Sequence, residues 1–576
     1  MLKNNLRPFF ILLIFFNADT TTAQLFPLKN YPLNYFEYPV VATKGLAANF
    51  GELRPNHYHM GLDCRTDQAQ NKKILAAADG YIAKVKIEPW GFGRAIYINH
   101  PNGLTTLYAH LNDFYEGLEK YVKQQQYALQ NWAVYLDIPA NLFPVKKGDT
   151  IALSGNTGGS QGPHLHFEIR DTKSDKVLNP LLFGFGIADT VAPDIIRLAV
   201  YNRNLSTYEQ TPTLIPIKKI KGICSIAPAL ITVNTDKVSF GISATDRVTG
   251  SSNRNGIYEA VLYNDDRPIT GFQIDNISYD ETRDFNAHID YKVRSGGGPY
   301  IQHLSRLPGY NNSIYKSIHD DGIINLADDS IHTIKIEVKD VNGNVSTVLF
   351  SLRRDTNYVE RVKIPLASQR QSNEFHPDFI NVYENSDLSF YLSENKLYDS
   401  IRFQYSETIP KPGNTVYQLH NTSVPVHGYF PISIKAQTAL PGKMVMHRFA
   451  NGKHDYTKAD AVMNGKETGW YKASFREFGS FELIIDTVAP VITPIGFKDG
   501  MNSSKQSRIV FVVKDNTEEV KFNAMLDGNW LRFSNDKGNR FIYDFDEMCP
   551  AGEHELKIVA EDQVGNVSER VYHFTR

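Results

Sequence analysis

The segment Gly162–Arg170 holds the polar residues best placed to do chemistry, because polar and apolar residues alternate along it from His164 onwards. A β-strand sends successive side chains to opposite faces, so His164, His166 and Glu168 share one face. The other face is predicted to be buried and carries Leu165, Phe167 and Ile169. Two imidazoles side by side on a rigid strand can serve as metal ligands or as general bases.

A second segment, His59–Asp63, repeats the alternation and places His59, Gly61 and Asp63 on one face. Gly61 leaves room for another group to come close to the backbone. Two imidazoles and one carboxylate form the ligand set of an open catalytic zinc site, whose fourth position holds water. The sequence therefore indicates a metal site built from this segment and a histidine of the 164–168 strand.

A third segment, Tyr108–Leu111, contains His110 and ends a predicted hairpin. The strands of this hairpin are 95–99 and 104–109, and a Pro-Asn-Gly turn at 101–103 joins them. A single histidine in a strand is most often structural, and His57-Tyr58-His59 shows that the His-x-His pattern also occurs by chance. The conjunction of three such segments, each near glycine, favours a catalytic site.

Residues 50–63, 108–111 and 155–168 together resemble the M23 peptidases, the lysostaphin-like zinc endopeptidases that cut peptide crosslinks of bacterial peptidoglycan. The resemblance covers roughly residues 40–172. It implies that the zinc ligands are His59, Asp63 and His166, and that the catalytic histidines beside the metal are His110 and His164. All five are present, whereas some relatives have lost ligands and act only as activators of other hydrolases.

Zinc held by two imidazoles and a carboxylate lowers the pKa of bound water to about 7. His110 and His164 are suited to move protons and to stabilise an oxyanion, and the sequence leaves open which of them is the base. The chain contains no His-Glu-x-x-His motif, which excludes a helix-borne site with a glutamate base. For Glu168, we expect a solvated residue near the strand end or a salt bridge.

Three other patterns are assigned structural roles. The glycine-rich run 155–162 precedes a strand and no Lys-Ser/Thr follows it, so it indicates a flexible loop rather than a phosphate-binding loop. The three cysteines lack Cys-x-x-Cys spacing, and Cys64, which follows Asp63, is expected to be a buried thiol. Asp340–Asn344 alternates oxygen ligands but lacks the terminal acidic residue of a calcium loop, so Asx-Gly turns without an ion are favoured.

The ends and the composition indicate an exported protein, periplasmic or extracellular. Residues 1–23 resemble a signal peptide, with Lys3 and Arg7 before an apolar run at 9–16 that is too short to span a bilayer. No other segment is apolar enough to span. A formal net charge of −2 argues against a nucleic-acid partner.

The 576 residues are too many for one domain, and a repeat divides them. Asp-Thr-Val-Ala-Pro occurs at 189–193 and 486–490, and related Asp-x-x-Gly-Asn-Val-Ser turns occur at 340–346 and 562–568. We predict a mainly β protein: an antiparallel-sheet M23 domain at 40–180, followed by β-sandwich domains that resemble immunoglobulin-like modules. These span 189–356, with insertions near 296–298, and 487–576. A β-rich region at 357–485 is placed by exclusion.

Residues 115–144 are predicted to insert a helix into the first domain. Its apolar face has helical spacing and comprises Leu118, Tyr121, Val122, Gln125, Ala128, Leu129 and Trp132. Pro139 and Pro144 prevent the helix from continuing. The helix either packs on the flank of the sheet or forms a wall or lid beside the cleft.

The leading functional hypothesis is a zinc endopeptidase that hydrolyses peptidoglycan crosslinks, with β-sandwich modules for spacing or targeting. An alternative is a non-catalytic cell-envelope regulator or binding protein in which the M23-like domain only docks, and a missing ligand would be its signature. A third is an adhesin-like structural protein. The β-sandwich modules could bind an envelope protein or a glycan, and the sequence names no ligand for them.

Overall fold

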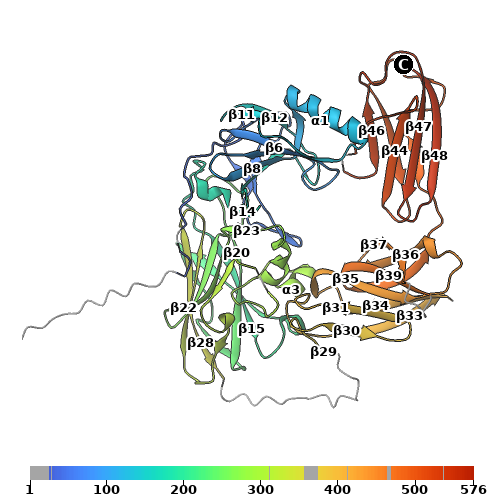
Figure 1. Cartoon of the computed structure of the whole chain (residues 1–576). Coiled ribbons are helices and arrows are strands. Elements are labelled where there is room, and N and C mark those ends of the chain that lie inside the picture. Colours follow the sequence, from blue (N-terminus) through green and yellow to red (C-terminus); the bar gives the residue numbers. More distant parts are fainter. Residues whose placement is uncertain are drawn as a thin grey trace, which may run out of the picture.

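The computed structural model describes residues 25–27, 29–310, 312–355, 374–411, 413–462, 469–535 and 537–576. Four β-rich units follow one another along the chain: an N-terminal unit (40–180), a second unit (189–354), a third unit (374–486) and a C-terminal unit (487–576). Figure 1 shows the C-terminal unit returning to the first, so that the four units form a ring. The prediction of a mainly β fold is confirmed, and the predicted signal peptide lies outside the described residues.

The main sheet of the N-terminal unit is antiparallel. Its strands, in spatial order, are β1 (Leu46–Ala48), β4 (Leu62–Arg65), β13 (His164–Asp171), β8 (Leu104–Ala109), β7 (Arg94–Asn99), β6 (Gly80–Ile87) and β10 (Val134–Asp137), with β11 (Pro144–Val145) on β6 and β14 (Val177–Leu178) on β13. A smaller sheet and a hairpin complete the unit: β5 (Lys73–Leu75), β12 (Thr150–Ser154) and β9 (Leu111–Phe114), then β2 (Leu53–Arg54) and β3 (His57–Tyr58).

The register of this sheet brings the three segments with candidate site residues together. Strand β13 lies between β4 and β8, and His166 pairs with Asp63 on one side and with Ala109 on the other. The apolar face predicted for β13 is fully buried, as expected: Leu165, Phe167 and Ile169. The polar face is also buried at His166 and Glu168, so burial does not alternate along this strand. The hairpin of β7 and β8 also forms as predicted. His110 directly follows β8 and therefore meets β13 from the other side.

The predicted helix exists as α1 (Glu116–Leu129), but the apolar face is partly wrong. Leu118 and Val122 are buried as expected, whereas Leu129 is 58% exposed. Gln126 is buried instead of Gln125, and its side chain donates a hydrogen bond to the carbonyl of Trp132. A polar residue can be buried here because the chain turns back and supplies an acceptor.

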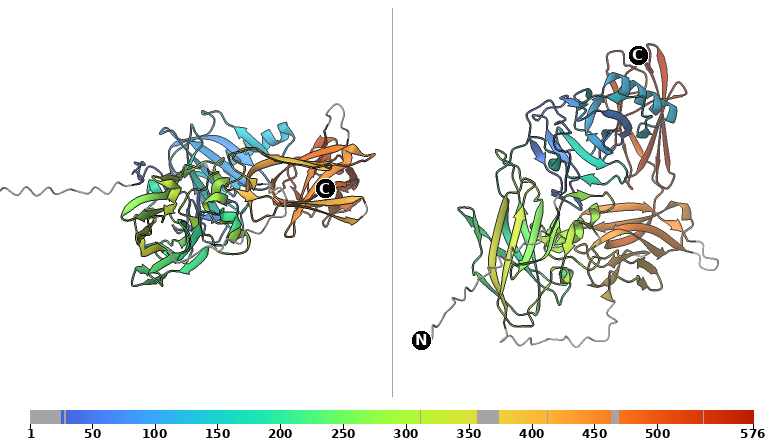
Figure 2. Two further views of the ribbon diagram at one scale, coloured as in Figure 1. Left: turned by 90° about the horizontal axis from the view of Figure 1, so that it is seen from below. Right: turned by 60° about the vertical axis from the view of Figure 1, so that its left-hand side comes forward.

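The outer side of α1 contacts the C-terminal unit, an arrangement that neither alternative for the helix anticipated (Figure 2). Lys123 forms ion pairs with Asp546 at 2.9 Å and Glu547 at 2.7 Å. The Tyr127 ring lies edge-on to Trp530, with ring centroids 5.3 Å apart. The helix thus joins the two ends of the ring.

The second unit consists mainly of two sheets. The first contains β16 (Thr213–Pro216), β15 (Asp194–Asn202), β20 (Lys237–Thr245), β24 (Gln302–His303) and β26 (Ile324–Asn325). The second contains β17 (Lys218–Ile220), β18 (Ile223–Ser225), β28 (Val345–Arg354), β27 (His332–Lys339), β21 (Glu259–Asn264), β22 (Arg267–Gln273), β25 (Tyr315–Ser317) and β19 (Leu230–Val233). Strand β23 (Asn276–Ile277) pairs with β14 of the N-terminal unit. Helices α2 (Phe285–His288) and α3 (Tyr291–Ser295) form an insertion that ends next to the predicted position, 296–298.

The other two units also contain paired sheets. The third has β30 (Asn381–Glu384), β31 (Leu388–Leu392), β35 (Pro425–Lys435), β39 (Trp470–Glu477) and β38 (Asp460–Ala461), then β33 (Tyr405–Lys411), β34 (Asn414–Leu419), β40 (Gly479–Ile485), β36 (Met444–Ala450) and β37 (Lys453–Lys458), with β29 (Glu374–Phe375) paired to β32 (Ile401–Arg402). The C-terminal unit has β41 (Val491–Pro494), β43 (Arg508–Lys514) and β46 (Arg540–Asp544), then β42 (Met501–Asn502), β48 (Val567–Thr575), β47 (Glu553–Asp562), β44 (Val520–Leu526) and β45 (Asn529–Trp530). None of the helices in the described ranges is long and apolar enough to cross a membrane.

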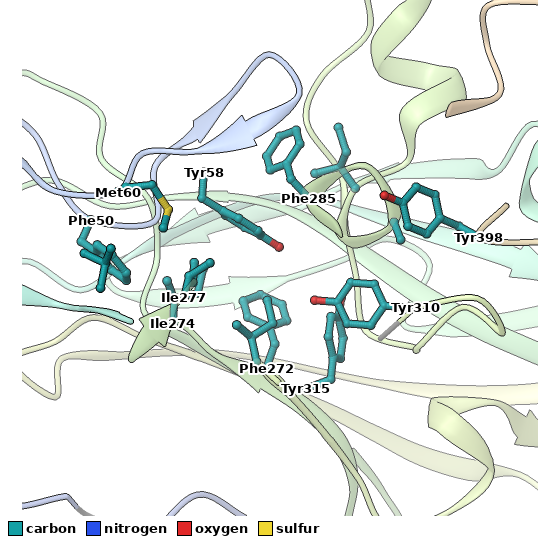
Figure 3. Packing of buried hydrophobic residues seen from close by; sticks show 14 of the residues in the cluster. Phe50, Tyr58, Met60, Phe272, Ile274, Ile277, Phe285, Tyr310, Tyr315 and Tyr398 are labelled. Carbon is teal, nitrogen blue, oxygen red and sulfur yellow. The ribbon is translucent and has the colours of Figure 1, made fainter. Parts of the chain in front are cut away.

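The hairpin of β2 and β3 ties the N-terminal unit to the second unit. Tyr58 is fully buried, and its ring lies edge-on to Phe285 of α2, with centroids 5.2 Å apart. Figure 3 shows Tyr58 among aromatic residues of the second unit, with Tyr398 of the third nearby. One continuous hydrophobic core runs through these three units, while the C-terminal unit has a core of its own. Because Tyr58 directly precedes His59, this packing also fixes the end of β3, directly after which the predicted ligand His59 follows.

Candidate metal centre

The predicted ligands His59, Asp63 and His166 converge in the N-terminal unit. His59 Nε2 lies 2.9 Å from Asp63 Oδ1 and 3.0 Å from His166 Nδ1, and His166 Nδ1 lies 3.1 Å from Asp63 Oδ1. Four ligands placed tetrahedrally about 2.0–2.1 Å from zinc are about 3.3 Å apart, so the three atoms are spaced like one face of such a site. All three residues are at least nine-tenths buried. The donor set therefore fits a divalent metal with one open position.

Each ligand is held from behind by a second group. His59 Nδ1 donates to the backbone carbonyl of Asn49 at 2.7 Å, and Arg54 Nη2 donates to Asp63 Oδ2 at 2.6 Å. Such partners fix the tautomer and orientation of metal ligands. The sequence analysis missed Asn49 and Arg54. Both lie in or beside the segment 50–63, but their distances to the ligands depend on how the β2–β3 hairpin folds.

The expectation that Glu168 is solvated is wrong, although the expected salt bridge forms. Its side chain is completely buried, and Oε1 accepts a hydrogen bond from His166 Nε2 at 2.9 Å. Arg170 donates to Oε2 at 2.7 Å, and the Tyr279 hydroxyl from the second unit donates to Oε1 at 2.5 Å. Burial alone would raise its pKa, but Arg170 and the hydrogen bonds from His166 and Tyr279 lower the pKa of Glu168 to about 2. Glu168 is therefore an ionised residue that orients the ligand His166.

The two predicted catalytic histidines lie beside the ligands without replacing any of them. The rings of His110 and His164 are 4.8 Å apart between centroids, and His110 is 5.9 Å from His166. Each Nδ1 is 2.8 Å from a backbone carbonyl, that of Thr157 for His110 and that of Gly162 for His164. These contacts leave Nε2 of each ring for chemistry, and His164 Nε2 lies 3.3 Å from Asp63 Oδ1.

The backbone and the electrostatics at His110 are both unusual. Its φ is +62°, a left-handed conformation that a non-glycine residue seldom adopts and that is most common at functional sites. Burial, together with the neighbouring His166 and His164, lowers the pKa of His110 to about 3, so this imidazole is neutral. Burial would also lower the pKa of His166, but hydrogen bonds to Asp63 and Glu168 raise it to about 9. The two carboxylates thus make the centre favourable for a cation.

Several smaller expectations are confirmed. A side chain at Gly61 would lie 2.5 Å from the carbonyl of Phe167, so β4 and β13 approach closely because this residue is glycine. His57 is exposed and does not join the ligands, although it belongs to a His-x-His pattern. Cys64 is a buried free thiol. The glycine-rich run 155–162 leads into strand β13, the element that the sequence predicted after it.

The C-terminal unit reaches the rim of the centre. The Lys537 backbone N–H donates to the carbonyl of Pro89 at 3.0 Å, and Lys537 Nζ donates to the carbonyl of Ser160 at 2.8 Å. The Ser160 hydroxyl lies 3.3 Å from His164 Nδ1. The loop before β13 is therefore fixed by a residue from the other end of the chain.

Comparison with known proteins agrees with this geometry. Residues 57–128 and 143–180 match the model of peptidase family M23. Residues 57–180 form an M23 peptidase domain. The match to the family model is interrupted at 129–142. Its first segment ends at residue 128 and so includes all of helix α1 except the last residue. A second match, to a Zu5-like domain, covers residues 372–486 and overlaps the region that the sequence placed only by exclusion.

Three relatives are similar to about a quarter of this chain. An uncharacterized metalloprotease from Haemophilus influenzae is 35% identical over 23% of this chain and 21% of its own length. The DD-carboxypeptidase/endopeptidase Mpg of Neisseria meningitidis is 31% identical over 24% of this chain and 23% of its own length. The peptidoglycan DD-endopeptidase ShyA of Vibrio cholerae is 29% identical over 23% of this chain and 26% of its own length. The chain thus spans only about a fifth to a quarter of the length of these curated relatives.

Proposed function

We propose that this protein is an exported, zinc-dependent endopeptidase that hydrolyses peptide crosslinks of bacterial peptidoglycan. The observation that carries the proposal is the complete set of groups around one open position: three mutually close ligand atoms with two further histidines beside them. Zinc is the metal proposed because two imidazoles and one carboxylate are its usual catalytic ligand set. The names of the relatives support the substrate class.

The roles of the residues follow from their hydrogen bonds. When bound, the metal supplies a Lewis acid that polarises the scissile carbonyl and activates water. His110 and His164 hold their Nδ1 protons on backbone carbonyls, so Nε2 of each can accept a proton from the attacking water and return it to the leaving amine. Arg54 and Glu168 hold Asp63 and His166 in the orientation that keeps the fourth position open.

The alternative of a non-catalytic docking module predicts a missing ligand. All three ligands and both further histidines are present, and their side chains converge. The hypothesis of an adhesin-like structural protein does not explain why five such groups gather in one place. The β-rich units remain candidates for spacing or targeting.

Digestion of purified peptidoglycan tests the proposal. The full-length protein with one equivalent of zinc should release muropeptides, identified by mass spectrometry, in which a peptide crosslink is cut. Asp63→Ala and His166→Ala should lose both the metal and the products, because two remaining ligands hold zinc weakly. His57→Ala is the matched control, since this neighbouring histidine is exposed and lies outside the ligand set. Intact crosslinks after digestion by the zinc-loaded wild-type protein would refute the proposal.

A further inference from the structure

Three aspartates that are distant in the sequence converge in the second unit. Asp189 precedes β15, Asp246 follows β20 and Asp340 follows β27, and each offers a carboxylate oxygen within 4.8 Å of the others. Asp246 is 6% exposed and Asp340 is 4% exposed. Within the described ranges, no lysine, arginine or histidine forms an ion pair with any of the three. Buried carboxylates are costly unless a cation compensates them.

The aspartates line a small cavity that also contains unpaired oxygen atoms. The cavity has a volume of about 70 Å³, enough for an ion and several waters. Asn255 is 3% exposed and lines the same cavity. Its Oδ1 and Asp246 Oδ1 are buried, and neither has a hydrogen-bond partner among the described residues. Unpaired buried acceptor oxygens beside three carboxylates indicate that a bound cation, rather than a hydrogen-bond donor, would satisfy them.

The C-terminal unit repeats the arrangement at equivalent positions. Asp486 opens the second Asp-Thr-Val-Ala-Pro segment, Asp515 directly follows β43, and Asp562 ends β47 before the second Gly-Asn-Val-Ser turn. Their carboxylate oxygens are again within 4.8 Å of one another. Asp515 Oδ1 is buried without a partner, as is Asp246 Oδ1 at the corresponding position. Two units of the same chain therefore build the same oxygen cluster.

We propose that each of these clusters binds a hard divalent cation, most suitably Ca²⁺. Calcium takes six to eight oxygen ligands in variable geometry and accepts carboxylates, amide carbonyls and waters. The Asx turns expected at Asp340 do form, since the Asn344 backbone N–H donates to Asp340 Oδ1 at 2.8 Å. These turns leave lone pairs of the Asp340 carboxylate free to bind a cation, because a carboxylate has about four lone-pair sites. The sequence favoured turns without an ion because this segment lacks the terminal acidic residue of a calcium loop. The further carboxylates come instead from Asp189 and Asp246, which lie far from it in the chain.

The proposed cations lie at junctions between units. Asp189 begins the second unit and Asp486 ends the third, directly before the C-terminal unit, so each cation would fix a residue at the start of an Asp-Thr-Val-Ala-Pro segment to two loops of the unit that follows. The first cluster also lies near the metal centre. Gly256, next to Asn255, exchanges two hydrogen bonds with the Asn49 side chain, whose backbone carbonyl holds His59. The Ca²⁺ sites would thus stiffen the ring that positions the M23 domain.

Calorimetric titration with CaCl₂ tests the proposal. Full-length protein is freed of metal on a chelating resin and given one equivalent of ZnCl₂, so that the M23 centre is already filled. We expect two Ca²⁺ per wild-type chain, one for Asp246→Asn and none for the double variant Asp246→Asn/Asp515→Asn. Asp266→Asn is the control, because Asp266 is exposed, has a positive φ that asparagine accepts, and belongs to neither cluster.

The melting temperature gives a second readout, because its dependence on calcium would not change if Asp246 had only a structural role. Without calcium, Asp246→Asn removes a repelling charge and should melt at or above the wild-type temperature. With millimolar calcium the order should reverse, because only the wild-type protein gains from binding at this site. The proposal is overturned if the zinc-loaded wild type binds no Ca²⁺ at millimolar concentration, if Asp246→Asn still binds two, or if the melting order does not reverse.

Discussion

Replacing Glu168 by glutamine tests whether the buried carboxylate behind His166 controls metal affinity. The substitution keeps the volume and removes the charge that accepts hydrogen bonds from His166, Arg170 and Tyr279. Because all these partners are donors, the amide NH₂ of glutamine must face one of them. Loss of a carboxylate that supports a metal-bound histidine typically weakens metal binding about 10–100-fold, or about 1.4–2.8 kcal/mol.

The assay is the zinc dissociation constant, measured by competition with a chromogenic chelator. Breaking a buried ion pair also costs about 3–5 kcal/mol of stability, so the measurement is made well below the melting temperature. Asp175→Asn is the matched control, because Asp175 bonds the same Arg170 at 3.0 Å but its side chain is 74% exposed and makes no contact with His166. Unchanged zinc affinity in folded Glu168→Gln, or an equal loss in Asp175→Asn, would refute the reasoning.

Three further experiments separate catalysis, folding and docking. His110→Ala should keep zinc, measured by elemental analysis, but lose about 10²–10⁴-fold in crosslink cleavage, and loss of zinc would show that His110 is a ligand instead. Tyr58→Ala should lower the free energy of unfolding by about 3–5 kcal/mol in denaturant titrations, because a fully buried ring is removed. Tyr58→Phe keeps the ring and should cost far less, so equal losses would contradict the packing argument. Lys123→Ala combined with Tyr127→Ala should release the C-terminal unit and raise the radius of gyration in small-angle X-ray scattering, and an unchanged radius would show that other contacts suffice.

Local patterns carried most of the information about the metal centre. The side-chain alternation in 164–170 follows from the geometry of strand β13, so the sequence alone could assign the face of His166. The strand predicted over His59–Asp63 forms only from Leu62 onwards, because residues 59–61 connect β3 to β4, and the tertiary fold brings His59 to Asp63. The turn at 101–103 likewise predicted the hairpin that ends at His110. The resemblance to M23 peptidases then separated ligands from catalytic histidines, a distinction that spacing alone left open.

Contacts between distant segments remained beyond the sequence. The sequence predicted that Glu168 is a solvated residue near the strand end or forms a salt bridge. Its partner Arg170 is two residues away on the same strand, but only the fold places the Tyr279 hydroxyl, from a different unit, on its carboxylate. Helix α1 shows the same limit, because its periodicity could not reveal that Lys123 and Tyr127 meet the C-terminal unit.

The sequence by itself indicated the β7–β8 hairpin, strand β13, the existence of helix α1 and the residue types of the candidate site, because each depends on neighbours within a few positions. The repeated Asp-Thr-Val-Ala-Pro segments were also visible there. Only the tertiary structure decided that Asp189, Asp246 and Asp340 share one cavity, that Glu168 is buried, and that the chain closes into a ring. The physical reason is that burial and charge pairing depend on which distant segments pack together, and a local pattern carries no record of its partner.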